Sequence, residues 1–162
     1  MRNISKHIFL NALACPVLGW ESRSQPVSEA PTMGEKFRME QGIEIGRRAR
    51  ALYPEGILIE EGDMASASEK TKRLMADPGV SILFEAAFLA GNFGARADIL
   101  RREKNGWRMI EVKSSVRDKV EFIDDMAYTA MLMDRSGYGI SNVSLLLISK
   151  AFRLGLRDED LF

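Results

Sequence analysis

The spacing of hydrophobic residues predicts helices in the first third of the chain. Apolar residues recur at helical intervals within residues 6–15 and 34–53, so we predict a short helix that stops at Pro16 and a long second helix. Residues 21–33 lie between them and hold two prolines among small polar and acidic groups, which is typical of a loop.

After the second helix, strand-like runs dominate the sequence. We predict strands at 57–61, 80–90, 95–104, 107–114 and 143–149, and helices at 66–79 and 121–135. Asn105-Gly106 is a strong hairpin signal. The final strand is a continuous apolar run after a helix, so we expect it to be buried and parallel to its neighbour. The pattern predicts an α/β fold with a mixed sheet flanked by helices.

The length of 162 residues suits one domain. We expect a single domain over 1–162, with an N-terminal helix and loop at 1–33 and a core at 34–150. Lys and Arg together number 23, as do Asp and Glu, so an overall basic field for nucleic acid is absent. A single cysteine excludes an internal disulfide and fits a cytoplasmic location. No run approaches the roughly 18 apolar residues of a membrane span.

Two glycines lie one turn apart in the long predicted helix, at Gly42 and Gly46. Each costs roughly 1 kcal/mol of helix stability relative to alanine, so the positions need an explanation. One interpretation is close packing of the helix on the sheet. The other is a site on that face of the helix.

The predicted hairpin brings charged residues together. A turn at Asn105-Gly106 places Asp98 opposite Lys113 and Leu100 opposite Glu111, so Asp98, Glu111 and Lys113 share one face. Opposed side chains have Cβ atoms about 5 Å apart and diagonal ones about 7–8 Å apart, a distance that a metal ion can bridge. The alternative is a solvated strand face with a cross-strand Asp–Lys pair.

Glu85 joins this face if Asn92-Phe93 forms the preceding turn, because Glu85 then pairs with Leu100. Carboxylate oxygens suit Mg²⁺ or Mn²⁺, which bind a phosphate oxygen and acidify an attacking water. A nearby lysine can orient that water or stabilise developing charge. These residue types therefore indicate phosphodiester hydrolysis.

The sequences ARADIL at 95–100 and IEVKSS at 110–115 resemble the PD-(D/E)XK nuclease superfamily. Residues 6–21, 37–54 and 111–133 are similar to segments of RecB-like and CRISPR-associated exonucleases, and most of all to bacterial proteins of unknown function with a RecB-like domain. The resemblance covers essentially the whole chain. It implies a restriction-endonuclease-like fold and a nuclease that cuts DNA.

Carried over residue by residue, the resemblance makes Asp98 and Glu111 metal ligands and Lys113 the catalytic lysine. The Val112 carbonyl becomes a further ligand of Mg²⁺ or Mn²⁺, whereas Glu85 is a candidate ligand only through the predicted register.

This chain departs from the family pattern at three places. Gly46 stands where many relatives have a histidine, and Thr129 and Met133 stand where many have a glutamine and a tyrosine. Cys15 is the only cysteine, so no complete iron–sulfur cluster can form within one chain, and we expect this residue to be buried. A catalytically weak module that binds nucleic acid or a protein partner, a homo-oligomer included, and a plain scaffold are therefore alternatives.

Overall fold

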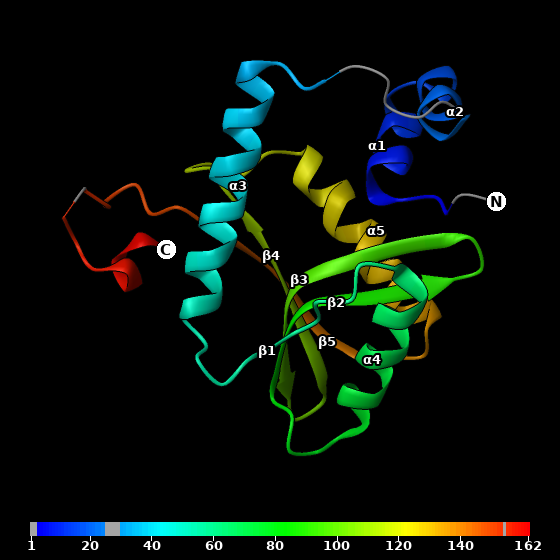
Figure 1. Ribbon diagram of the computed structural model, residues 1–162. Helices are drawn as coiled ribbons and strands as arrows, with labels where there is room; N and C mark the ends of the chain where they lie inside the picture. The colour runs from blue at the N-terminus through cyan, green and yellow to red at the C-terminus, as the bar shows by residue number, and fades with distance from the viewer. Residues whose placement is uncertain (1–2, 25–29, 154) are drawn as a thin grey trace.

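The chain adopts an α/β fold with a five-stranded mixed sheet in a computed structural model that describes residues 3–24, 30–153 and 155–162 (Figure 1). The elements in chain order are α1 (Lys6–Ala14), α2 (Pro16–Ser24), α3 (Met33–Ala51), β1 (Ile57–Leu58), α4 (Met64–Ala76), β2 (Ile82–Ala90), β3 (Phe93–Glu103), β4 (Gly106–Lys113), α5 (Glu121–Arg135), β5 (Ile140–Leu147) and the 3₁₀-helix η1 (Asp158–Leu161). Among these helices none is both long enough and apolar enough to cross a membrane.

The strands lie side by side in chain order, from β1 to β5. Two antiparallel hairpins join β2, β3 and β4 in the middle of the sheet. The outer strands β1 and β5 run parallel to β2 and β4. The parallel arrangement expected for the last strand is thus confirmed, and the sheet is mixed as predicted. The expectation that this strand is buried was wrong, because β5 is an edge strand and its side chains are half-buried or exposed.

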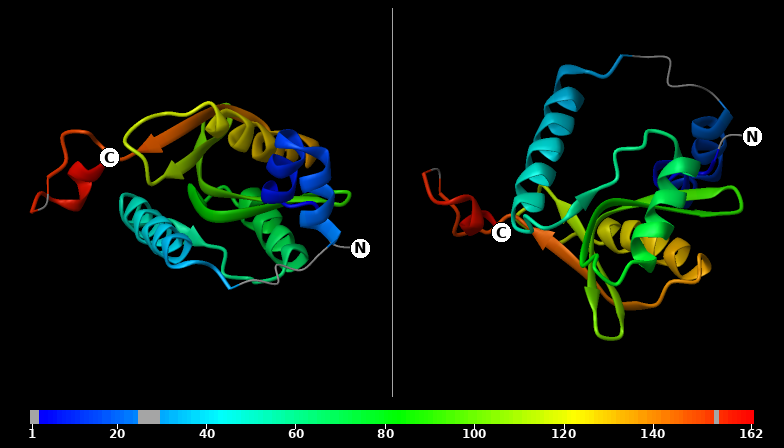
Figure 2. Two further views of the ribbon diagram at one scale, coloured as in Figure 1. Left: turned by 90° about the horizontal axis from the view of Figure 1, so that it is seen from above. Right: turned by 60° about the horizontal axis from the view of Figure 1, so that its bottom comes forward.

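Helices α3 and α5 lie on opposite faces of the sheet (Figure 2). On the α5 face, Leu100 and Met109 pack with Tyr128 and Leu132 of α5 in the larger apolar core. On the α3 face a smaller cluster surrounds Ala49, and its buried members on the sheet are Ile82, Phe84, Ile99 and Ile110. Each central strand therefore contributes side chains to both cores, as alternation along a strand requires.

Three expectations about the helical third were wrong in part. Residues 21–24 form the end of α2, a helix absent from the predicted pattern because Gly19 and several polar groups weaken its apolar spacing. Residues 25–29 of the predicted loop lie outside the described residues. Cys15 is exposed, because it lies between α1 and α2. Apolar residues do recur at helical intervals along α3, but this spacing does not give a fully buried face, because the side chains of Phe37 and Ile43 are 59% and 69% exposed.

The register of both hairpins differs from the predicted one by two residues. Glu103 pairs with Gly106, whose φ of +133° suits glycine, so the turn falls at Lys104-Asn105. As a result Leu100 pairs with Met109 rather than with Glu111.

In the other hairpin the turn falls at Gly91-Asn92, because Ala90 pairs with Phe93. Leu100 pairs there with Leu83 rather than with Glu85. A shift of two residues by itself leaves the alternation of side chains unchanged. The alternation is broken at Glu85, however, because Phe84 packs in the cluster on the α3 face and Ala86 in the core on the α5 face, so Glu85 does not join Glu111 on one face as predicted.

Candidate functional site

Strands β3 and β4 separate at Asp98. Their last pair on this side is Ile99 with Ile110. Beyond this pair the Asp98 side chain takes the place of a backbone hydrogen bond between the strands, because the Val112 N–H donates a hydrogen bond of 2.7 Å to Asp98 Oδ2. Asp98 is therefore linked to the strand that carries Glu111 and Lys113, although it does not lie opposite Lys113 as predicted.

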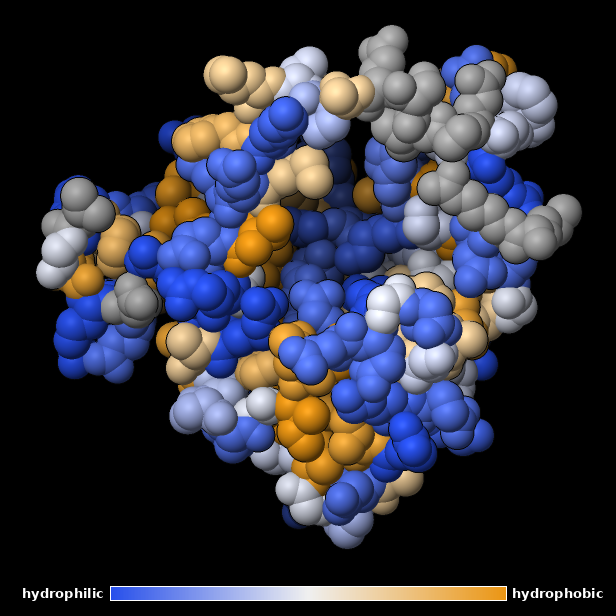
Figure 3. Space-filling view, in the orientation of Figure 1, coloured by the Kyte–Doolittle hydropathy of each residue, from blue (hydrophilic) through white to orange (hydrophobic). Residues whose placement is uncertain are grey.

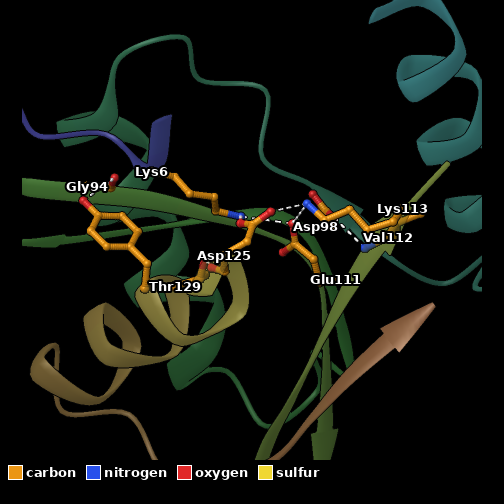
Figure 4. Close-up of polar contacts among 9 residues, drawn as sticks. Lys6, Gly94, Asp98, Glu111, Val112, Lys113, Asp125 and Thr129 are labelled. Carbon is orange, nitrogen blue, oxygen red and sulfur yellow. Dashed lines mark hydrogen bonds and ion pairs between the residues drawn. The ribbon is translucent and has the colours of Figure 1, made fainter. Parts of the chain in front are cut away.

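Glu111 lies at the centre of an ion-pair cluster (Figure 4). Its side chain is buried, and Oε1 accepts hydrogen bonds from Lys113 Nζ at 2.9 Å and from Lys6 Nζ at 3.0 Å. Asp125 of α5 contacts the same two ammonium groups, with Lys6 Nζ 2.7 Å from Oδ1 and Lys113 Nζ paired with Oδ2. Two carboxylates thus pair with the same two lysines, and the four residues come from α1, β4 and α5.

The cluster controls the ionisation of its members. Burial alone acts to lower the pKa of Lys6 and of Lys113, but the carboxylates of Glu111 and Asp125 outweigh it and raise both pKa values above the ordinary lysine value. Burial likewise acts to raise the pKa of Asp125, but the two lysines hold it below the ordinary range. Lys6, Lys113 and Asp125 are therefore charged at neutral pH.

Asp98 behaves in the opposite way. Burial raises its pKa to about 7, and the negative charge of Glu111 adds to the rise, while the Val112 N–H and the Lys6 charge oppose it. The ionised form of Asp98 consequently lacks sufficient positive charge in its surroundings. A cation bound beside Asp98 would supply that charge.

Asp98 also faces an open cleft between the sheet and α3. The cleft has a volume of about 530 Å³, and Figure 3 shows a hollow with a hydrophilic floor beside α3. Its lining comprises Met39, Gly42, Ile43, Gly46, Arg50, Glu85, Asp98, Ile99 and Val112. The helix glycines therefore border a cavity and do not pack closely on the sheet, which favours the second interpretation of their positions.

Glu85 reaches the same cleft from β2. Its φ of +56° is rare for a residue with a side chain and interrupts the pairing between Phe84–Ile99 and Ala86–Ala97. Its carboxylate is 3.7 Å from Arg50 Nη1. Glu85 and Asp98 thus line one cleft, while Glu111 lies in the ion-pair cluster next to it.

The residues present fit a divalent cation in part. Glu111 Oε2 is buried and has no hydrogen-bond partner among the described residues, so one oxygen of this carboxylate is available to a ligand. Asp98 needs a counter-charge, and oxygen ligands suit Mg²⁺ or Mn²⁺. Within the described ranges, however, no three acidic, histidine or cysteine side chains are close enough together to form a ready metal cage.

Lys6 and Asp125 belong to this cluster, and the sequence patterns did not single them out. Asp125 carried one usable signal, because it shares the buried face of α5 with Thr129 and Leu132, where a carboxylate needs a partner. Thr129 and Met133, the altered family positions, are fully buried, and the Thr129 hydroxyl donates to the Asp125 carbonyl at 3.4 Å. Lys6 carried no such signal, since its contacts join segments far apart in sequence.

Comparison of the chain with protein-family models, with curated proteins and with solved structures finds no match.

Proposed function

We propose that this chain is a divalent-metal-dependent nuclease that hydrolyses DNA phosphodiester bonds, on a restriction-endonuclease-like fold. The observation that carries the proposal is the position of Asp98. Its half-buried carboxylate bonds to the strand that bears Glu111 and Lys113, it lines an open cleft, and it needs a positive charge. A half-buried and a buried carboxylate that could hold a divalent ion, with an adjacent lysine at the edge of a cleft, can support phosphodiester hydrolysis.

Each residue has a role in this proposal. Asp98 and Glu111 would hold the cation, and the Val112 carbonyl and Glu85, which line the same cleft as Asp98, are further candidate ligands. A bound Mg²⁺ or Mn²⁺ would bind a phosphate oxygen and lower the pKa of the attacking water. Lys113 orients that water or stabilises the charge that develops on the phosphate.

The family resemblance is supported by the surroundings of Gly46. This position, where many PD-(D/E)XK relatives have a histidine, borders the same cleft as Asp98. A glycine offers no side-chain ligand there, so a bound cation would depend on Asp98, Glu111 and the neighbouring oxygens.

A second candidate function is a catalytically weak module that binds nucleic acid or a protein partner. The apolar side chains of α3 beside the cleft favour it, because Phe37, Met39 and Ile43 are between 59% and 69% exposed. Large exposed apolar groups that gather on one helix are typical of an interaction surface.

DNA cleavage distinguishes the two functions. Labelled single-stranded and double-stranded DNA is incubated with the protein in Mg²⁺, in Mn²⁺ or in EDTA, alongside the Glu111→Gln variant. The nuclease proposal predicts cleavage that requires the metal and is lost in Glu111→Gln. Binding without cleavage under every condition contradicts it and favours the binding module.

A further inference from the structure

Lys6 is the first residue of α1, yet its ammonium group lies at the candidate metal centre. Lys6 Nζ is 3.0 Å from Glu111 Oε1 and 2.7 Å from Asp125 Oδ1. The Lys6 side chain is 22% exposed, as is that of Lys113. The N-terminal segment therefore contributes a second ammonium group to a cluster that already contains the proposed catalytic lysine (Figure 4).

The segment that carries Lys6 is fixed to the sheet by contacts that do not involve its ammonium group. Ile4 forms a bridge with Phe93, in which the Ile4 N–H donates to the Asn92 carbonyl at 2.7 Å and the Gly94 N–H donates to the Ile4 carbonyl at 2.9 Å. The Tyr128 hydroxyl also donates to the Ile4 carbonyl at 2.6 Å.

On the next turn, Phe9 stacks on Tyr128 with ring centroids 4.6 Å apart, and Ile8 is buried. These contacts place Lys6 at Glu111 whether or not the ion pair forms. They also indicate that a neutral residue at position 6 leaves α1 in place.

The charges of the cluster conflict with a bound cation. Oε1 of Glu111 already accepts hydrogen bonds from two ammonium groups. A divalent ion on the same carboxylate would lie within a few ångströms of both ammonium groups, and like charges at that separation repel strongly in a partly buried site. One ammonium group has to withdraw from Glu111 before the ion binds firmly.

Asp125 gives Lys6 a place to withdraw to, because the contact between Lys6 and Asp125 does not involve Glu111. Through its ion pair with Glu111, Lys6 performs in the metal-free protein part of the charge compensation that a metal ion would provide.

We propose that Lys6 competes with the metal ion for Glu111. It neutralises Glu111 in the metal-free protein, and it would give up this contact and keep its contact with Asp125 when the ion binds. The inference rests on the proposed function, since it takes Asp98 and Glu111 as the metal ligands. If the inference holds, Lys6 lowers the affinity of the site for the metal ion. Metal binding is then coupled to the ion pair between Lys6 of α1 and Glu111.

Mn²⁺ binding to the full chain tests this inference without any measurement of cleavage. The dissociation constant is measured by titration calorimetry for the wild type, for Lys6→Met and Lys6→Gln, and for Asp98→Asn. Lys72→Met is the matched control, because Lys72 is an exposed lysine on α4 and its loss changes the net charge equally.

We expect both neutral variants at position 6 to bind Mn²⁺ about tenfold more tightly than the wild type, through the loss of a neighbouring like charge. Lys72→Met should match the wild type, and Asp98→Asn should weaken binding. Unchanged or weaker binding in both Lys6→Met and Lys6→Gln would overturn the inference while leaving the nuclease proposal intact. Mn²⁺ binding that is absent in all proteins, or unaffected by Asp98→Asn, would overturn both.

Discussion

The Asp98 carboxylate accepts a hydrogen bond of 2.7 Å from the Val112 N–H. This bond takes the place of a backbone ladder bond where β3 and β4 separate. It positions a titratable side chain at the edge of a cleft, next to the strand that carries Glu111 and Lys113. Strands β3 and β4 thus separate at Asp98, which is a metal ligand in the proposed function.

Replacement of Asp98 by asparagine should make the stability of the metal-free protein less sensitive to pH. The folded state raises the pKa of Asp98 from 3.8 to about 7, so it retains a proton that the unfolded chain releases. Stability therefore falls as the pH rises between these two values, and is lowest above the folded pKa. Asparagine has no such proton, and its carbonyl oxygen can still accept the Val112 hydrogen bond.

Urea unfolding in EDTA measures this effect. Between about pH 5 and about pH 8, the wild type should lose roughly 2 kcal/mol of unfolding free energy relative to Asp98→Asn. A difference between the two proteins that does not change with pH would show that Asp98 is not perturbed in the folded state.

Loss of the Asp125 carboxylate should destabilise the fold. Asp125 is 7% exposed and contacts both Lys6 and Lys113, so Asp125→Asn leaves two partly buried ammonium groups with one carboxylate. Because the lysines keep some contact with solvent, we expect a loss of about 1 to 3 kcal/mol in the free energy of unfolding.

The neighbouring Asp124 provides the matched control. It lies on the exposed side of α5, so Asp124→Asn should change the stability by no more than about 0.5 kcal/mol. Equal unfolding free energies for the two variants at neutral pH are the outcome that contradicts a stabilising role for the cluster.

Gly42→Ala should stabilise the protein, because the glycine borders a cavity rather than a packed surface. A Cβ built at Gly42 meets no atom within 4 Å. Alanine in the interior of a helix is favoured over glycine by about 1 kcal/mol, and that gain should appear as a higher melting temperature.

Gly56→Ala should have the opposite effect and lower the melting temperature, because a Cβ at this position would lie 2.2 Å from Cζ of the buried Phe84 ring. Thermal unfolding of both variants compares the two positions. A lower melting temperature for Gly42→Ala would mean that something packs against that face of α3.

The hairpins and the helix that follows them could be predicted from the sequence. The helix expected at 121–135 has the bounds of α5, and both hairpins form. The pairing was wrong by two residues in each hairpin, because turn signals place a loop without fixing which residues close it. Glu111 and Lys113 are two residues apart on the same strand, so their common face does not depend on this pairing.

The remaining members of the cluster could not be inferred from local patterns. Lys6 reaches Glu111 because Ile4 and Phe9 fix the N-terminal segment to the sheet and to Tyr128, which are contacts between distant parts of the chain. The N-terminal helix, expected as an addition to the core, therefore contributes directly to the candidate site. The apolar spacing of α3 was equally misleading, since Phe37 borders solvent rather than the core.

The single-turnover rate of DNA cleavage in Mn²⁺, compared between the wild type and Lys113→Met, tests the proposed function most directly. Lys119→Met is the control, because Lys119 is an exposed lysine just before α5. If Lys113 has the proposed catalytic role, Lys113→Met should lower the rate at least about 100-fold, while Lys119→Met should cleave at the wild-type rate. A cleavage rate that Lys113→Met leaves unchanged, or that persists in EDTA, would contradict a metal-dependent nuclease built on Asp98, Glu111 and Lys113.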